Sequence, residues 1–71
     1  MLSTSELSLL QAKKEIALYG QRTQRMFGMV KDLVHEKEGS ETFSKIYSRI
    51  EKYEKISDRM ELEIAAYLNQ V

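Results

Sequence analysis

Cysteine, proline and tryptophan are absent from this sequence, and glycine is scarce. Without cysteine the 71 residues can form neither disulfide bonds nor thiolate metal sites, which fits a reducing compartment. With no proline and only three glycines, little in the composition interrupts a helix. Eleven basic residues balance eleven acidic ones, with the signs mixed along the chain. We therefore expect no nucleic-acid partner and no polybasic membrane patch.

Long apolar runs are also missing. No stretch approaches the roughly 20 apolar residues that cross a bilayer, and there is no signal-peptide pattern, so we expect no direct membrane insertion of this segment. The length fits one small domain, residues 1–71. A core in a chain this short rarely supplies more than about 3–5 kcal/mol. Because disulfides are excluded, we expect the chain to associate with other helices, with a homodimer as the simplest case.

What is present is a strong helical pattern. Ser3 followed by Glu6 forms a capping box, which predicts a helix start, and the helix should run over about residues 5–37. Apolar or small residues then recur in two heptad rows typical of bundle packing: Leu9, Ile16, Thr23 and Val30, and Ala12, Tyr19, Met26 and Leu33. Gly20 beside these rows suggests either a close approach of another helix or simple tolerance of a glycine.

A second helix is predicted after a short turn. Gly39 suits the C-terminal cap of the first helix and Ser40 the N-cap of the next, which should cover about residues 41–70. Its rows are Phe43, Ile50, Ser57, Ile64 and Val71, and Ile46, Tyr53, Met60 and Tyr67. A connection this short makes the helices antiparallel. The predicted fold is therefore all-α, an antiparallel two-helix hairpin, and two hairpins would form a four-helix bundle.

Carboxylates border the apolar stripe in the middle of the second helix. Glu54 and Asp58 are four residues apart and Glu61 follows after three more, so the three share a helix face. Converging carboxylates hold hard or borderline cations in helical bundles, which makes these three residues candidate metal ligands. The alternative is that Glu54 and Asp58 point to solvent and pair with Lys55, Arg59 or neighbours on another helix.

No other part of the chain offers comparable chemistry. His35, the only histidine, forms D-x-x-H with Asp32, a spacing similar to the E-x-x-H of di-iron bundles. Those sites use their motif twice, whereas it occurs once here, so we expect His35 to interact with a helix C-terminus. No serine has a recognisable partner base, and no glycine loop could cradle a phosphate. We therefore expect no enzyme activity, including activity of the di-metal kind.

The segment EKYEKISDRMELEIAAYL, residues 51–68, resembles the end of a PhoU-type helix, with E-x-x-x-D followed by E-I-x-x-Y-L. The segment LLQAKKEIALYG, residues 9–20, is similar to the opening of the same domains. The resemblance covers about residues 9–70 and is greatest to the PhoU-like cytoplasmic region of bacterial sodium/phosphate cotransporters.

This resemblance implies a PhoU-like helical accessory segment that regulates phosphate transport by protein contact. It would sit at the inner face of the cell membrane, beside the membrane-embedded transporter part of its parent. PhoU relatives bind metal through E-x-x-x-D, which corresponds to Glu54 and Asp58, so iron, zinc or nickel is the implied cofactor. PhoU domains have three helices and this chain has two, so a complete site needs carboxylates from elsewhere. The alternative is a generic helical oligomerisation module unrelated to phosphate.

Overall fold

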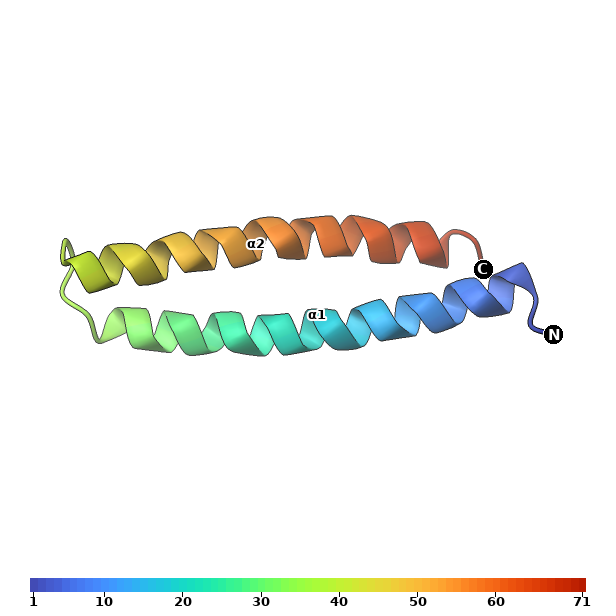
Figure 1. Ribbon diagram of the computed structural model, residues 1–71, viewed down its shortest axis with the longest axis horizontal. Coiled ribbons are helices and arrows are strands. Elements are labelled where there is room, and N and C mark those ends of the chain that lie inside the picture. The colour runs from blue at the N-terminus through green and yellow to red at the C-terminus, as the bar shows by residue number, and fades with distance from the viewer.

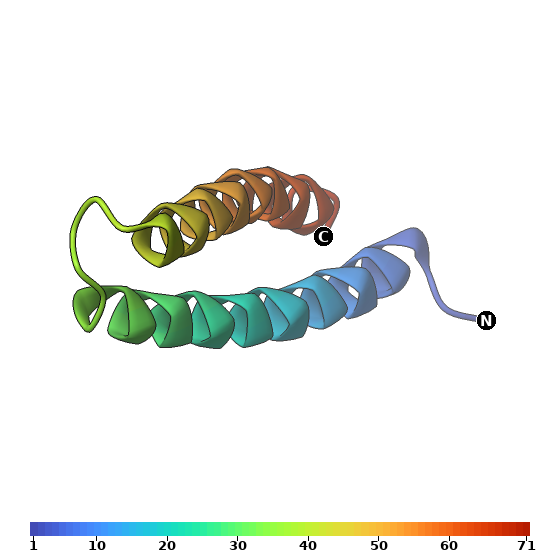
Figure 2. The same cartoon turned by 60° about the vertical axis from the view of Figure 1, so that its left-hand side comes forward.

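Two long helices lie side by side and antiparallel in the computed structural model, which describes all 71 residues (Figures 1 and 2). Helix α1 spans Thr4–Val34 and helix α2 spans Glu41–Leu68. The molecule measures 55 × 15 × 12 Å, with both termini at one end and the connection at the other (Figure 1). The predicted all-α antiparallel hairpin is confirmed.

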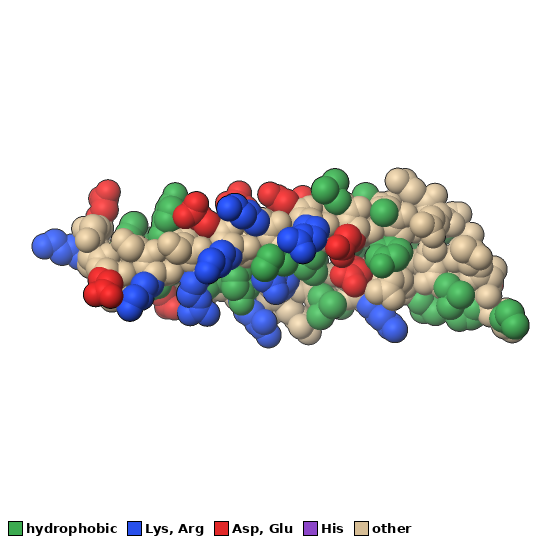
Figure 3. Space-filling view, turned by 45° about the horizontal axis from the view of Figure 1, so that its top comes forward, with side chains coloured by type: hydrophobic (Ala, Val, Ile, Leu, Met, Phe, Trp, Pro, Cys, Tyr) green, Lys and Arg blue, Asp and Glu red, His purple; other side chains and the backbone are tan.

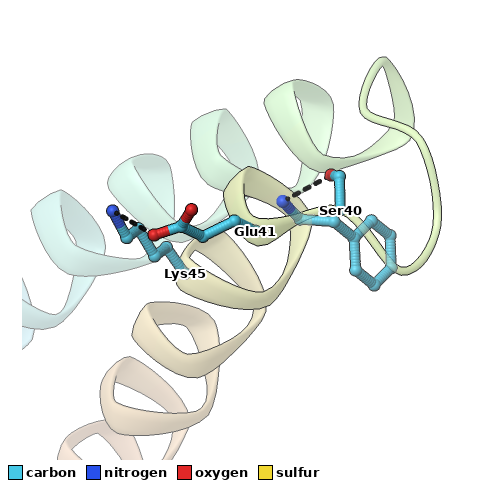
Figure 4. A network of polar contacts seen from close by, with 4 residues as sticks. Ser40, Glu41 and Lys45 are labelled. Atoms are coloured by element: carbon cyan, nitrogen blue, oxygen red, sulfur yellow. Dashed lines mark hydrogen bonds and ion pairs between the residues drawn. The ribbon is translucent and has the colours of Figure 1, made fainter.

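Serine caps begin both helices. The Ser3 hydroxyl accepts from the Glu6 N–H at 3.1 Å, and the Ser3 N–H donates to Glu6 Oε1 at 3.4 Å, which completes the predicted capping box. At α2 the Ser40 hydroxyl accepts from the Phe43 N–H at 3.1 Å, and Glu41 pairs with Lys45 one turn later (Figure 4). These bonds satisfy backbone donors that a helix start would otherwise leave free.

The first helix ends three residues before its predicted end. Val34 is its last residue. The N–H of His35 donates to the Asp32 carbonyl at 3.2 Å, and the N–H of Glu36 donates to the Leu33 carbonyl at 3.0 Å. Gly39 is therefore not the cap residue. It lies within the turn at φ 85°, a backbone angle that residues with a side chain rarely adopt. The chain uses residues 35–40 for the reversal, which leaves fewer residues for α1 than helical periodicity alone suggested.

The second helix also ends slightly early, at Leu68 and not at residue 70. The last two residues bond in a tighter pattern, since the Gln70 N–H donates to the Tyr67 carbonyl and the Val71 N–H to the Leu68 carbonyl. Tightening of this kind is common in the last turn of a helix.

The interface between α1 and α2 buries very little. Only four side chains are buried: Ser8, Ala12, Ser57 and Met60. Many large apolar side chains stay exposed: Leu2, Leu7, Leu9, Leu10, Ile16, Leu18, Phe27, Val30, Val34, Tyr47, Leu62 and Leu68 among them. Two helices can cover only one side of each other, so the other apolar side chains of both helices stay open to solvent.

Close packing of the two helices occurs at Ala12, which is completely buried, and not at Gly20. A Cβ added to Gly20 would meet nothing within 4 Å, and the residue is exposed. Gly20 therefore does not mark the approach of α2. Neither helix has the continuous apolar length that crossing a membrane requires.

Candidate functional site

The polar residues at the middle of the hairpin surround Ser57, which faces α1. Its side chain is buried and its hydroxyl has no hydrogen-bond partner. From helical periodicity, Glu54 and Glu61 lie on one side of Ser57, while Tyr53 and Met60 lie on the other. The carboxylates thus flank the contact between the helices and do not interrupt it.

Tyr19 of α1 reaches across to one of these carboxylates. Its hydroxyl donates to Glu61 Oε1 at 2.6 Å. This hydrogen bond is the main reason that the pKa of Tyr19 is raised, with smaller effects from desolvation and from the negative charges of Glu61 and Asp58. The raised pKa favours the protonated form, which matches the role of the Tyr19 hydroxyl as a hydrogen-bond donor.

Arg22 makes the second contact between the helices, on the other side of the hairpin. Its guanidinium carbon lies 4.4 Å from the centre of the Tyr53 ring, which is cation–π geometry. The Arg22 Nε is buried and has no hydrogen-bond partner. A groove of about 350 Å³ beside it is lined by Glu15, Leu18, Gln21, Arg22, Arg25 and Met60.

The surface chemistry changes along the molecule. Figure 3 shows Lys and Arg side chains interspersed with Asp and Glu from the turn end to the middle of the face in view, with hydrophobic side chains among them and at the end that holds the termini. At that end the Ser8 hydroxyl donates to Gln70 Oε1 at 3.0 Å, and the Ser5 hydroxyl donates to the Gln70 carbonyl at 3.2 Å. These two bonds fasten the chain just after α2 to the first turns of α1.

The predicted metal ligands are all exposed. Glu61 accepts a hydrogen bond from the Tyr19 hydroxyl, while Glu54 and Asp58 form no ion pair or hydrogen bond. The alternative role for Glu54 and Asp58 is seen in part, because both are exposed to solvent but neither pairs with Lys55, Arg59 or the other helix. No three acidic or histidine side chains in the hairpin come close enough together to hold a metal ion. A metal at this point would need ligands from outside the hairpin. His35 occupies the C-cap of α1, as its position in the sequence predicted.

Sequence reasoning missed the contacts of Tyr19 and Arg22. Both residues were visible as part of a helical pattern, and Tyr19 was assigned to the apolar row. Their partners are 42 and 31 positions away, so finding them required the exact alignment of one helix on the other. The only available signal was that Arg22 follows Tyr19 by three residues in α1 and that α2 carries a second tyrosine, Tyr53.

Comparison with known proteins does not extend the family resemblance. No protein-family model matches the chain, and no significant match was found among curated proteins or solved structures. The hairpin offers unpaired carboxylates on one side, a groove lined by two arginines on the other, and exposed apolar rows, all of which suit binding by contact.

Proposed function

We propose that this chain is a PhoU-like accessory segment of a bacterial sodium/phosphate cotransporter that regulates phosphate transport by protein contacts. It would lie in the cytoplasm at the inner face of the membrane, against the membrane-embedded part of its parent. It would carry out no reaction of its own. The hairpin would self-associate into a four-helix bundle, because its exposed apolar rows need cover.

The observation that carries the proposal is the exposed E-x-x-x-D pair at the middle of α2. Glu54 and Asp58 have no basic partner within the hairpin, although Lys55 and Arg59 follow each of them directly. Unpaired carboxylates on a helix are available to a cation or to another protein. This supports the role that the PhoU resemblance implies for these two residues.

Metal binding is the finer part of the proposal. Glu54, Asp58 and Glu61 would hold iron, zinc or nickel together with carboxylates from another helix of the parent protein. The test is to purify the parent protein and measure its metal content before and after the double substitution Glu54→Ala/Asp58→Ala. Glu51→Ala/Glu63→Ala, which removes two other exposed carboxylates of α2, is the matched control. Equal metal content in all three proteins would contradict metal binding at this site.

The regulatory role has a separate test. Deleting this chain from the cells that encode it should change sodium-dependent uptake of labelled phosphate, and the wild-type sequence should restore it. The Glu54→Ala/Asp58→Ala variant should fail to restore it. If uptake is the same with and without the chain, the phosphate role is wrong.

A generic helical oligomerisation module is the second candidate. The exposed apolar rows favour it, because they need a partner whatever the parent protein does. Unchanged phosphate uptake combined with stable self-association would support this second candidate over the first.

A further inference from the structure

One face of the hairpin combines the exposed apolar rows with the carboxylates. In α1, Ile16 and Thr23 lie on one side of Tyr19, and Arg22 lies on the other. Arg22 stacks on Tyr53 and shares a groove with Met60, so it marks one face. Ile16 and Thr23 must then share the opposite face with Glu54 and Glu61. We call this the mixed face. It comprises Leu9, Ile16, Gly20, Thr23, Phe27, Val30 and Val34 of α1 and Phe43, Tyr47, Ile50, Glu54, Asp58, Glu61 and Leu68 of α2.

Polarity on the mixed face changes with distance along the hairpin. The bonds from Tyr19 to Glu61 and from Ser8 to Gln70 show which residues of α1 and α2 lie at the same height. On that alignment the carboxylates lie at midlength, level with Ile16, Gly20 and Thr23. Apolar residues from both helices occupy the two ends. The same alignment places Leu9 level with Leu68, Phe27 with Ile50, Val30 with Tyr47, and Val34 with Phe43.

We propose that the mixed face is covered by a second copy of the chain with both turns at the same end of the dimer, an inference that rests on the self-association in the proposed function. In this dimer the two-fold axis runs parallel to the long axis of the hairpin. It packs α1 of each copy on α2 of the other, and each residue lies at the same position along the dimer in both copies. The four apolar pairs that are level within one hairpin then meet again across the interface. The face is complementary to itself in this arrangement.

The carboxylates meet small and polar groups in the same-end arrangement. Asp58 of one copy lies over Gly20 of the other, and Glu54 lies over Thr23. A Cβ at Gly20 would meet nothing within 4 Å in the hairpin, so the position leaves room for the Asp58 carboxylate to keep contact with water. Glycine within a helix lowers the stability of that helix, and this contact explains why α1 nevertheless has a glycine at position 20.

The opposite-end arrangement is disfavoured by charge. A two-fold axis across the hairpin would set α2 against α2 at midlength, with Asp58 facing Asp58 and Glu54 facing Glu61. Like charges opposite one another oppose association. Packing α1 on α2 avoids placing these like charges directly opposite one another on adjacent helices.

Spin labels distinguish the two arrangements directly, because the chain has no cysteine of its own. A label at Glu38→Cys in the turn should give a distance below about 30 Å in the same-end dimer, since a four-helix bundle is about two helix diameters wide. A distance near the hairpin length of 55 Å would overturn the proposal. Lys55→Cys at midlength should give a short distance in either dimer. No coupling at either position would instead overturn self-association, and with it the proposed function's assembly.

A matched pair of glycine substitutions tests the contact at Gly20. Gly20→Leu should weaken dimerisation at least tenfold in sedimentation measurements, because leucine fills the space that Asp58 of the partner needs. Gly28→Leu is the control, since Gly28 is equally open but points away from α2. Equal dimer affinity in the two variants would overturn the contact, whereas helical content should be retained in both.

Discussion

At the scale of single residues, the Tyr19–Glu61 hydrogen bond is the most specific feature of the hairpin. It joins the middle of α1 to the C-terminal half of α2, with 2.6 Å between the Tyr19 hydroxyl and Glu61 Oε1, and it involves one of the three carboxylates that the sequence singled out. Ser57, directly between the helices, contributes a buried hydroxyl with no partner instead of apolar contact. The middle of the hairpin therefore combines the buried Met60 with polar contacts at its edges.

Stability should depend on the ionisation of Tyr19. Its pKa is raised by the bond to Glu61, so the folded chain holds the proton more tightly than the unfolded chain does. The contribution is fully present below the ordinary tyrosine pKa of about 10 and is lost as the pH rises through the raised value. The difference in melting temperature between wild type and Tyr19→Phe should shrink across this range.

Tyr47→Phe provides the control for this titration, because the Tyr47 hydroxyl makes no hydrogen bond. Melting curves between pH 8 and 11 would be compared for the three proteins. A difference between wild type and Tyr19→Phe that stays constant over this range would contradict the role assigned to the bond.

At the scale of elements, most of the hairpin could be predicted because its determinants are local. Ser3, Glu6 and Ser40 each act within a single turn, and the heptad rows depend only on spacing along one helix. The end of α1 could not be placed in the same way, because the chain reversal depends on where α2 lies. The candidate site was predicted in part for the same reason. The position of Glu61 was visible in the sequence, but its partner Tyr19 was not.

The turn offers a second prediction. Gly39 is the only residue with a positive φ, so Gly39→Ala should lower the free energy of unfolding by about 1 kcal/mol. Gly28→Ala lies within α1 in open space, where alanine should instead raise it by up to about 1 kcal/mol. Chemical denaturation of both variants measures the two changes. A similar change in both would mean that the backbone of the turn is not what requires glycine.

At the scale of the whole molecule, the main feature is the small amount of buried apolar surface. Ala12 and Met60 are the only buried apolar side chains in the isolated hairpin, which is little for a chain of 71 residues. Covering the mixed face would add the apolar side chains of both helices to a common core. Folding and association should therefore occur together.

This coupling predicts that stability depends on protein concentration. For a folded dimer and unfolded monomers, a tenfold increase in concentration stabilises the dimer by about 1.4 kcal/mol, or roughly 4 °C in melting temperature. Calorimetry over a hundredfold range of concentration measures the shift. A melting temperature independent of concentration would show that the hairpin folds as a monomer.

The position of the two termini has a mechanical consequence. Both ends of the chain leave from one end of the hairpin, and the Ser5 and Ser8 bonds to Gln70 fasten them there. A body attached at that end would carry the hairpin as a lever, with the turn at residues 35–40 about one molecular length, 55 Å, away. A small tilt at the attached end would move the tip of this lever by many ångströms.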